Sequence, residues 1–299
     1  MNVYNFAYNY VVFKVEKSCS LFSFLKDQGL SDRFIKGSYR ENLIRVNEMA
    51  PPHFGALKTN DLVKIYYADE DPGPYVEDSA DLDIIFENEN FLLINKPAGL
   101  AVHPTFSRQD QTLYGKIAGY YKKNNISRSI HLVNRLDIET SGLIVLGKNP
   151  LFHQQLAKDF IECKVKKEYL ALVEGAFERE IFVDKNILDG DDFKMKRRVD
   201  PRGKSARTKL VPVFSSKEYS LVKAFPETGR THQIRVHLAS LGHPILGDSL
   251  YGGSKALIQR SALHAKGLDF VDPFTNMHMS FKTPLPADME ALVSALGHK

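Results

Sequence analysis

A single aspartate, Asp137, lies within the segment His131 to Lys148 (HLVNRLDIETSGLIVLGK) of this 299-residue chain. It follows Arg135 and precedes Thr-Ser-Gly and the apolar run Leu143 to Leu146. The run holds no polar residue and no proline, so it predicts a strand that is buried on both faces. A polar turn leading into such a strand would hold Asp137 on rigid scaffold. Its carboxylate could then act as a nucleophile or as a general base.

The three residues Arg-Leu-Asp alone favour a plainer interpretation, an Asp-capped turn with Arg135 as a surface ion-pair partner. The longer pattern R-L-D-x-x-T-S-G before an apolar strand is more specific, and it resembles the signature of the RluA/RluD-type RNA pseudouridine synthases. The resemblance implies that Asp137 is the essential catalytic residue. It also implies that Arg135 fills the space left by a flipped-out base. The chain departs from the family at Asn134, where His is usual.

A second signature, GRTHQIRVHL, spans Gly229 to Leu238. Its apolar spacing predicts a helix that ends at Gly242. The resemblance implies that Arg235 is the ion-pair partner of Asp137, and that Arg230 and His232 orient the turn or contact RNA phosphate.

Four further elements match the same family. The resemblance implies that Tyr169, in the predicted strand within Lys164 to Gly175, lies against the target base, whereas on its own it would be a half-buried strand residue. It implies that Leu263, in Leu-His-Ala, lies beneath that base. Lys204 belongs to a G-K-x-A-x-T element. The segment from His243 to Gly252 is expected to buttress the site.

The chemistry that this family performs needs such a set of residues. Uridine becomes pseudouridine when the bond from ribose to base nitrogen is cut, the base turns, and its carbon 5 joins the ribose. The reaction is redox-neutral, so we expect no cofactor, and the sequence holds no dinucleotide fingerprint or P-loop. We also expect no metal, because His232, His237 and His243 are not spaced to share one helical face. An ionised Asp needs a nearby Arg, and a flipped base needs an aromatic and an apolar side chain.

Composition sets broader bounds. The length suggests two domains, and a hydrophobic content of 43% is ordinary for a globular protein. The two cysteines form no disulfide framework or metal-ligand spacing. Because there is no signal peptide and no long apolar run, we expect a cytoplasmic protein without membrane contact. We also expect a monomer. A net charge of +4 permits RNA as a partner without demanding it.

The chain divides at an acidic, proline-rich segment, residues 69–81. Residues 1–68 predict two short helices, the second capped by Ser31, followed by strands, and they resemble an S-four-type RNA-binding module. Residues 82–299 would be the catalytic domain. The expected fold class is α+β, with a mixed, largely antiparallel sheet and flanking helices after a small α/β module.

The run 194–209 (KMKRRVDPRGKSARTK) carries eight basic side chains against one acidic residue, Asp200, which favours phosphate binding over a merely solvated surface. We expect the substrate to be large-subunit ribosomal RNA, with transfer RNA as the alternative. Two rival functions stay open. One is a catalytically silent RNA-binding ribosome-assembly factor. The other is a nucleoside hydrolase, for which Glu139 would be the nearest second carboxylate.

Overall fold

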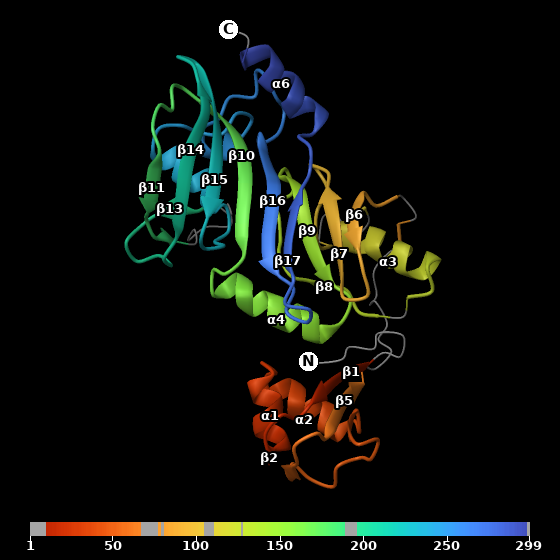
Figure 1. The fold of residues 1–299 in the computed structure, drawn as a ribbon. Coiled ribbons are helices and arrows are strands. Elements are labelled where there is room, and N and C mark those ends of the chain that lie inside the picture. The colour runs from red at the N-terminus through yellow and green to blue at the C-terminus, as the bar shows by residue number, and fades with distance from the viewer. Residues whose placement is uncertain are drawn as a thin grey trace.

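The computed structural model describes residues 10–66, 77–78, 81–104, 111–126, 128–188 and 196–297 (Figure 1). Most of the expected linker 69–81 lies outside these ranges, as do residues 194–195 of the basic run. The position of the domain boundary therefore stays a prediction. No helix in the described ranges is long and apolar enough to cross a membrane.

Residues 10–66 form a small antiparallel sheet, ordered β1-β5-β3, with two helices. The elements are β1 (Tyr10–Lys14), β2 (Cys19–Ser20), α1 (Leu21–Asp27), α2 (Asp32–Arg40), β3 (Ile44–Val46), β4 (Ala56–Leu57) and β5 (Leu62–Tyr66). Ser31 caps α2 as predicted, because its Oγ accepts a hydrogen bond from the amide of Phe34 at 3.3 Å. The sequence pattern did not predict β1, although its Val11 and Phe13 are buried in the core.

The rest of the chain is built on one large sheet, ordered β11-β14-β15-β10-β16-β9-β7-β6, with β17 beside β16 and β8 beside β9. The strands β16 and β9 run parallel, whereas the other neighbours run antiparallel, which confirms the predicted mixed, largely antiparallel sheet. The strands are β6 (Ile84–Glu87), β7 (Phe91–Lys96), β8 (His131–Leu132), β9 (Ser141–Gly147), β10 (Lys166–Glu174), β11 (Ile181–Asp184), β14 (Arg207–Ser215), β15 (Tyr219–Pro226), β16 (Leu263–Val271) and β17 (His278–Lys282). A separate ribbon pairs β12 (Ile187–Leu188) with β13 (Arg198–Val199).

Helices cover both faces of this sheet around β9, every residue of which is buried (Figure 1). Leu143 and Val145 point into the core shared with α4 (Pro150–Ile161). Ile144 and Leu146 point into the opposite core, shared with α3 (Leu113–Lys123). The alternation of β9 between two cores explains its continuous apolar sequence.

Two further helices complete the fold, α5 (Gln233–Ser240) and α6 (Ala287–Gly297). The predicted apolar residues of α5, Ile234 and Leu238, pack into a third core against β10 and β15. Gly242 follows its last turn in the left-handed region at φ 84°, as the sequence predicted.

The small N-terminal unit docks on α4, beside which it lies in Figure 1. Gln154 Nε2 donates to the carbonyl of Gly29 at 3.0 Å, and Gln155 Nε2 donates to that of Gln28 at 2.8 Å. Phe152 and Leu156 of α4 also share one apolar core with α1 and β1. Helix α4 is thus the contact between the two parts of the chain.

Candidate active site

The turn that carries Asp137 is fixed through its own backbone. Thr140 N donates to the carbonyl of Asp137 at 3.1 Å, and Gly99 N donates to that of Ile138 at 2.8 Å. Lys96 Nζ donates to the same Ile138 oxygen at 3.1 Å. Because these carbonyls are held, the backbone that carries the Asp137 carboxylate is rigid where the chain enters β9.

Lys96 is fully buried behind this turn. Besides Ile138, its ammonium group donates to the carbonyls of Pro97 and Leu100 at 2.8 and 3.0 Å. Burial lowers the pKa of Lys96 to about 7, and the negative charge of Asp137 opposes that shift. A titratable cation therefore supports the candidate site from inside the protein.

The Thr-Ser-Gly sequence after the turn serves the parallel pairing of β9 with β16. Gly142 lies opposite Ala265 at φ 113°, and a Cβ on it would lie 2.3 Å from the Ala265 carbonyl oxygen. The neighbouring pair, Ser141 and His264, joins Oγ to Nδ1 at 2.9 Å. Only glycine permits this close approach of the two strands.

Arg235 brings two carboxylates together. Its Nη1 donates to Asp137 Oδ2 at 2.9 Å, while Nε and Nη2 form a bidentate pair with Asp248 at 2.7 and 2.9 Å. Its guanidinium carbon lies 5.0 Å from the centre of the Tyr251 ring. Burial disfavours the charged guanidinium, but hydrogen bonds to Asp248 and the charge of Asp137 outweigh it and raise the pKa of Arg235. Arg235 is thus a permanent cation held in one orientation.

The start of α5, which carries Arg235, is pinned to the sheet by Gln233. Its Nε2 donates to Arg207 O and Thr208 Oγ1 at 2.8 and 2.9 Å. Its Oε1 accepts from Thr228 Oγ1 at 2.7 Å and from Arg230 N at 3.0 Å. The Gln of the second signature therefore fixes the helix register, and with it the reach of Arg235.

Tyr169 and Leu263 share one face of the sheet. Tyr169 pairs with Ala265, and two residues along the same strands Ala171 pairs with Leu263. Residues opposite each other, and residues two apart, point to the same face. Burial, and then the charge of Asp137, raise the pKa of the Tyr169 phenol, so the phenol lies within electrostatic reach of the carboxylate.

Of the remaining expected site residues, three are exposed, and His232 is largely buried. Arg135 is exposed, and its charge reaches His103, whose pKa is lowered first by burial and then by Arg135. Arg230 donates from Nε to Ser205 O at 2.9 Å and so ties the start of α5 to the basic segment. Lys204 is exposed, and its backbone pairs with Ile187. His232 lies beside Asp137, with Nε2 3.7 Å from Oδ2.

Asn134, the departure from the family pattern, packs its amide against the backbone of β9. Its Oδ1 accepts from Val145 N at 2.8 Å, and its Nδ2 donates to Leu143 O at 3.2 Å. The side chain extends the β8–β9 pairing by imitating a strand. Its contacts are therefore structural and are made with β9.

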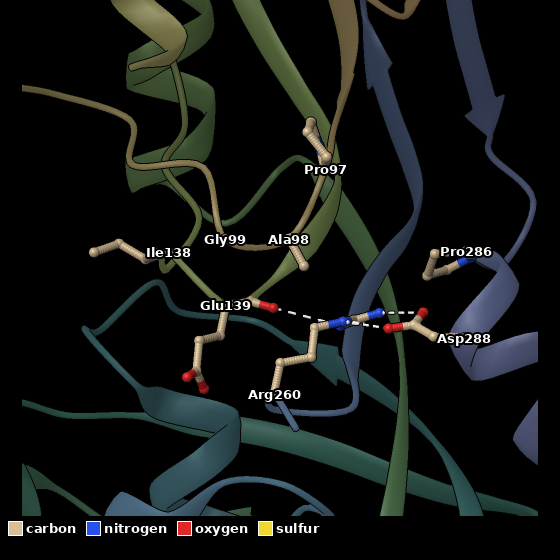
Figure 2. Close-up of a pocket in the computed structure, with 8 residues that line it drawn as sticks. All are labelled: Pro97, Ala98, Gly99, Ile138, Glu139, Arg260, Pro286 and Asp288. Atoms are coloured by element: carbon tan, nitrogen blue, oxygen red, sulfur yellow. Dashed lines mark hydrogen bonds and ion pairs between the residues drawn. The ribbon is translucent and has the colours of Figure 1, made fainter. Parts of the chain in front are cut away.

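Glu139, the second carboxylate that a nucleoside hydrolase would need, is engaged elsewhere. Its Oε2 accepts from Ser261 N at 3.1 Å, and its carbonyl accepts from Arg260 Nη1 at 3.4 Å. Figure 2 shows its carboxylate pointing away from the Arg260 guanidinium, which forms a bidentate pair with Asp288 at 2.7 Å for both bonds. Glu139, Arg260 and Asp288 belong to the lining of a cavity of about 480 Å³. This arrangement disfavours the two-carboxylate geometry of glycoside hydrolysis.

Sequence reasoning assigned no individual role to Lys96, Asp248 or Tyr251. The structure places Lys96 behind the Asp137 turn, Asp248 against Arg235 and Tyr251 against His232. Asp248 and Tyr251 lie in the family-like segment from His243 to Gly252, and Lys96 begins the turn Lys96-Pro97-Ala98-Gly99, which also resembles an element of the family. Those motifs were the sequence signal from which the three residues could have been identified. Their partners, however, are set by contacts between distant segments, which a single sequence does not reveal.

Comparisons with known proteins agree with this geometry. Residues 90–240 match the family described as RNA pseudouridylate synthase. The chain is 39% identical over 252 residues to an uncharacterized RNA pseudouridine synthase, YhcT, of Bacillus subtilis (83% of each chain). It is 37% identical to the ribosomal large subunit pseudouridine synthase D of Zymomonas mobilis (72% of this chain, 73% of the relative).

A solved structure supports the same assignment. The human RNA pseudouridylate synthase domain containing 1 is 26% identical and superposes with a TM-score of 0.58, over 74% of this chain and 97% of its own. The sheet with its flanking helices is thus the pseudouridine synthase fold. From the paired signatures, the fold and these relatives it follows that the chain belongs to the RluA/RluD-type family of RNA pseudouridine synthases.

Proposed function

We propose that this enzyme isomerises specific uridines of large-subunit ribosomal RNA, with Asp137 as its catalytic residue. The observation that carries the proposal is the chain of contacts from Asp137 through Arg235 to Asp248. A carboxylate that must react as an anion needs a cation fixed beside it. Asp248 fixes that cation, since it occupies the two guanidinium nitrogens that do not contact Asp137.

Asp137 acts on the ribose of the target nucleotide, as a nucleophile or as a base towards the 2′ position. The bond from ribose carbon 1 to base nitrogen breaks, and a new bond joins that carbon to carbon 5 of the base. The proton on carbon 5 is lost and the base nitrogen gains one, so the reaction is balanced as an isomerisation. Arg235 holds the reacting carboxylate ionised and in place throughout.

The target base is held by residues that share a sheet face. Tyr169 lies against the flipped base and Leu263 supports it from below, consistent with their positions on neighbouring strands. Arg135, exposed beside Asp137, enters the space that the base leaves in the RNA. An RNA helix would otherwise lose a stacking partner at that point.

Exposed cations provide the RNA contact around this centre. Lys204 and the Arg230-anchored segment lie next to the start of α5. In the N-terminal unit, Arg33, Lys36 and Arg40 lie exposed along α2 at spacings that share one helical face. We assign residues 1–68 as an S-four-like RNA-binding module, joined by residues 69–81 to the catalytic domain, 82–299.

The choice of ribosomal RNA is supported by relatives named for the large ribosomal subunit. The test is to map pseudouridine in total RNA from cells with the gene, without it, and with the Asp137→Asn form. We expect sites in large-subunit RNA that disappear without the gene and return only with the wild type. Sites confined to transfer RNA would overturn the substrate assignment. Sites that the Asp137→Asn form restores would favour another catalytic group.

A further inference from the structure

His232 occupies a constrained position between Asp137 and Tyr251. It precedes α5 in the left-handed region, at φ 58° and ψ 18°, which is uncommon for a residue with a side chain. Its Nδ1 lies 2.9 Å from the Tyr251 hydroxyl, and its Nε2 lies 3.7 Å from Asp137 Oδ2. The two ring nitrogens therefore face different groups, and the location of the ring proton decides what His232 does.

The Tyr251 hydroxyl fixes that location. It accepts a hydrogen bond from the backbone N–H of Arg197 at 2.9 Å, and its own proton stays available for donation. Among the described residues, His232 Nδ1 is the acceptor within reach of that proton. Burial raises the pKa of Tyr251, which keeps the phenol protonated at neutral pH. This arrangement favours a bare Nδ1, with the proton of a neutral ring on Nε2.

The surroundings of Nε2 favour the same tautomer. A bare Nε2 would direct its lone pair at a carboxylate, whereas an N–H there is attracted to it. The charged groups that face the ring are Asp137, Arg235, Asp248 and Arg197. Burial lowers the pKa of His232, Asp137 and Asp248 oppose that shift, and the two arginines support it, so the ring is neutral at pH 7.

Two groups approach one oxygen of the carboxylate, Arg235 through a hydrogen bond at 2.9 Å and His232 at 3.7 Å, which is longer than a hydrogen bond. Arg235 Nη1 and His232 Nε2 each face Oδ2, while Oδ1 makes no hydrogen bond to any described residue. The Asp137 side chain is 28% exposed. We infer that His232 is a positioning residue, held by Tyr251 as the Nε2–H tautomer, which with Arg235 engages Oδ2 and leaves Oδ1 as the oxygen that acts on the RNA. This inference rests on the proposed catalytic role of Asp137.

The tautomer is measured directly on the wild-type enzyme without RNA, by two-bond ¹H–¹⁵N correlation of the histidine rings at pH 7 to 8. The His232 signals are assigned by their loss in His232→Gln. We expect Nε2 to resonate as a protonated nitrogen and Nδ1 as a bare one, with the pattern lost in Tyr251→Phe. That variant keeps the ring beneath Arg235 and removes only the hydroxyl. A protonated Nδ1 in the wild type would overturn the inference.

Steady-state kinetics test the positioning role of His232, because the side-chain amides of Gln and Asn can replace different nitrogens of its ring. Gln can place an N–H near Nε2, towards Asp137, whereas Asn can place one only near Nδ1, towards Tyr251. We expect kcat for His232→Gln to exceed that for His232→Asn by about tenfold, with similar KM values. Equal losses in the two variants would overturn a role for the Nε2 donor. If the wild type failed to modify ribosomal RNA, the substrate assignment would fall, while the tautomer measurement would still decide the ring chemistry.

Discussion

At the scale of single residues, Lys96 gives the site an internal cation whose protonation is sensitive to pH. Its folded pKa is lowered to about 7 by burial, below the ordinary value of 10.5. Below pH 7 both folded and unfolded chains hold the proton, so this group adds no pH dependence there. Between about pH 7 and 10.5 only the unfolded chain holds it, so stability rises with pH through that window.

We therefore expect the wild type to gain stability over Lys96→Met between pH 7 and 10. The difference in free energy of unfolding should rise by up to about 1.4 kcal/mol per pH unit and stay flat below pH 7. Urea unfolding of both proteins across this range measures it, and groups common to both cancel in the difference. A flat difference up to pH 10 would mean that the three carbonyls keep Lys96 charged.

The sequence could name an expected site residue only where that residue lies in a recognisable motif. Asp137 and Arg235 were paired by resemblance, and the structure brings their atoms to 2.9 Å. The sequence could not reveal Asp248 as the second partner, because a buried ion pair depends on where two distant segments meet. The same limit concealed the contacts of His232 with Asp137 and Tyr251, which belong to other segments of the chain.

At the scale of elements, the close pairing of β9 and β16 holds the Asp137 turn against the sheet. Gly142→Ala combines a left-handed φ with a Cβ 2.3 Å from the Ala265 carbonyl oxygen. Gly242 is a matched control, since its φ is 84° and a Cβ there meets nothing within 4 Å. The difference between the two positions isolates the close approach from backbone strain.

We expect Gly142→Ala to lower the free energy of unfolding by about 2 kcal/mol more than Gly242→Ala, with a matching loss of activity. Gly242→Ala should cost about 1 kcal/mol, from the left-handed conformation alone. Chemical unfolding and turnover of RNA by both variants provide the measurements. Equal losses of stability and of activity at the two glycines would contradict this expectation. They would show that the close approach of β9 and β16 does not matter for the Asp137 turn.

Elements with local signals were predicted well. The cap of α2 at Ser31 and the buried strand around Leu143 to Leu146 follow from residues next to each other in the chain. Strand order and the parallel pair of β9 and β16 could not be predicted, since pairing is decided by tertiary packing.

At the scale of the whole molecule, the N-terminal unit is integrated through a shared core. Phe152 and Leu156 of α4 pack with residues of α1 and β1, so removing residues 1–68 would expose an apolar face. A test of RNA binding by this unit should therefore change its surface charge and leave its core intact.

We expect a triple alanine variant of the α2 face to weaken RNA binding and to reduce the slope of log affinity against log salt by about two units. The variant changes Arg33, Lys36 and Arg40, which are exposed. A control with equal charge loss changes other exposed lysines of the unit, Lys14, Lys17 and Lys58. Binding titrations at several salt concentrations compare the two, and an unchanged slope in the α2 variant would exclude this face as the RNA contact.

The central claim, that Asp137 carries the chemistry, is tested most directly by Asp137→Asn. Asparagine keeps the size of the side chain and an oxygen to accept from Arg235, but it has no charge with which to attack the sugar or remove a proton. The measurement is pseudouridine formed over time in a transcribed RNA fragment that the wild type modifies, alongside RNA affinity. We expect unchanged affinity and no detectable pseudouridine; appreciable turnover by Asp137→Asn would contradict the account.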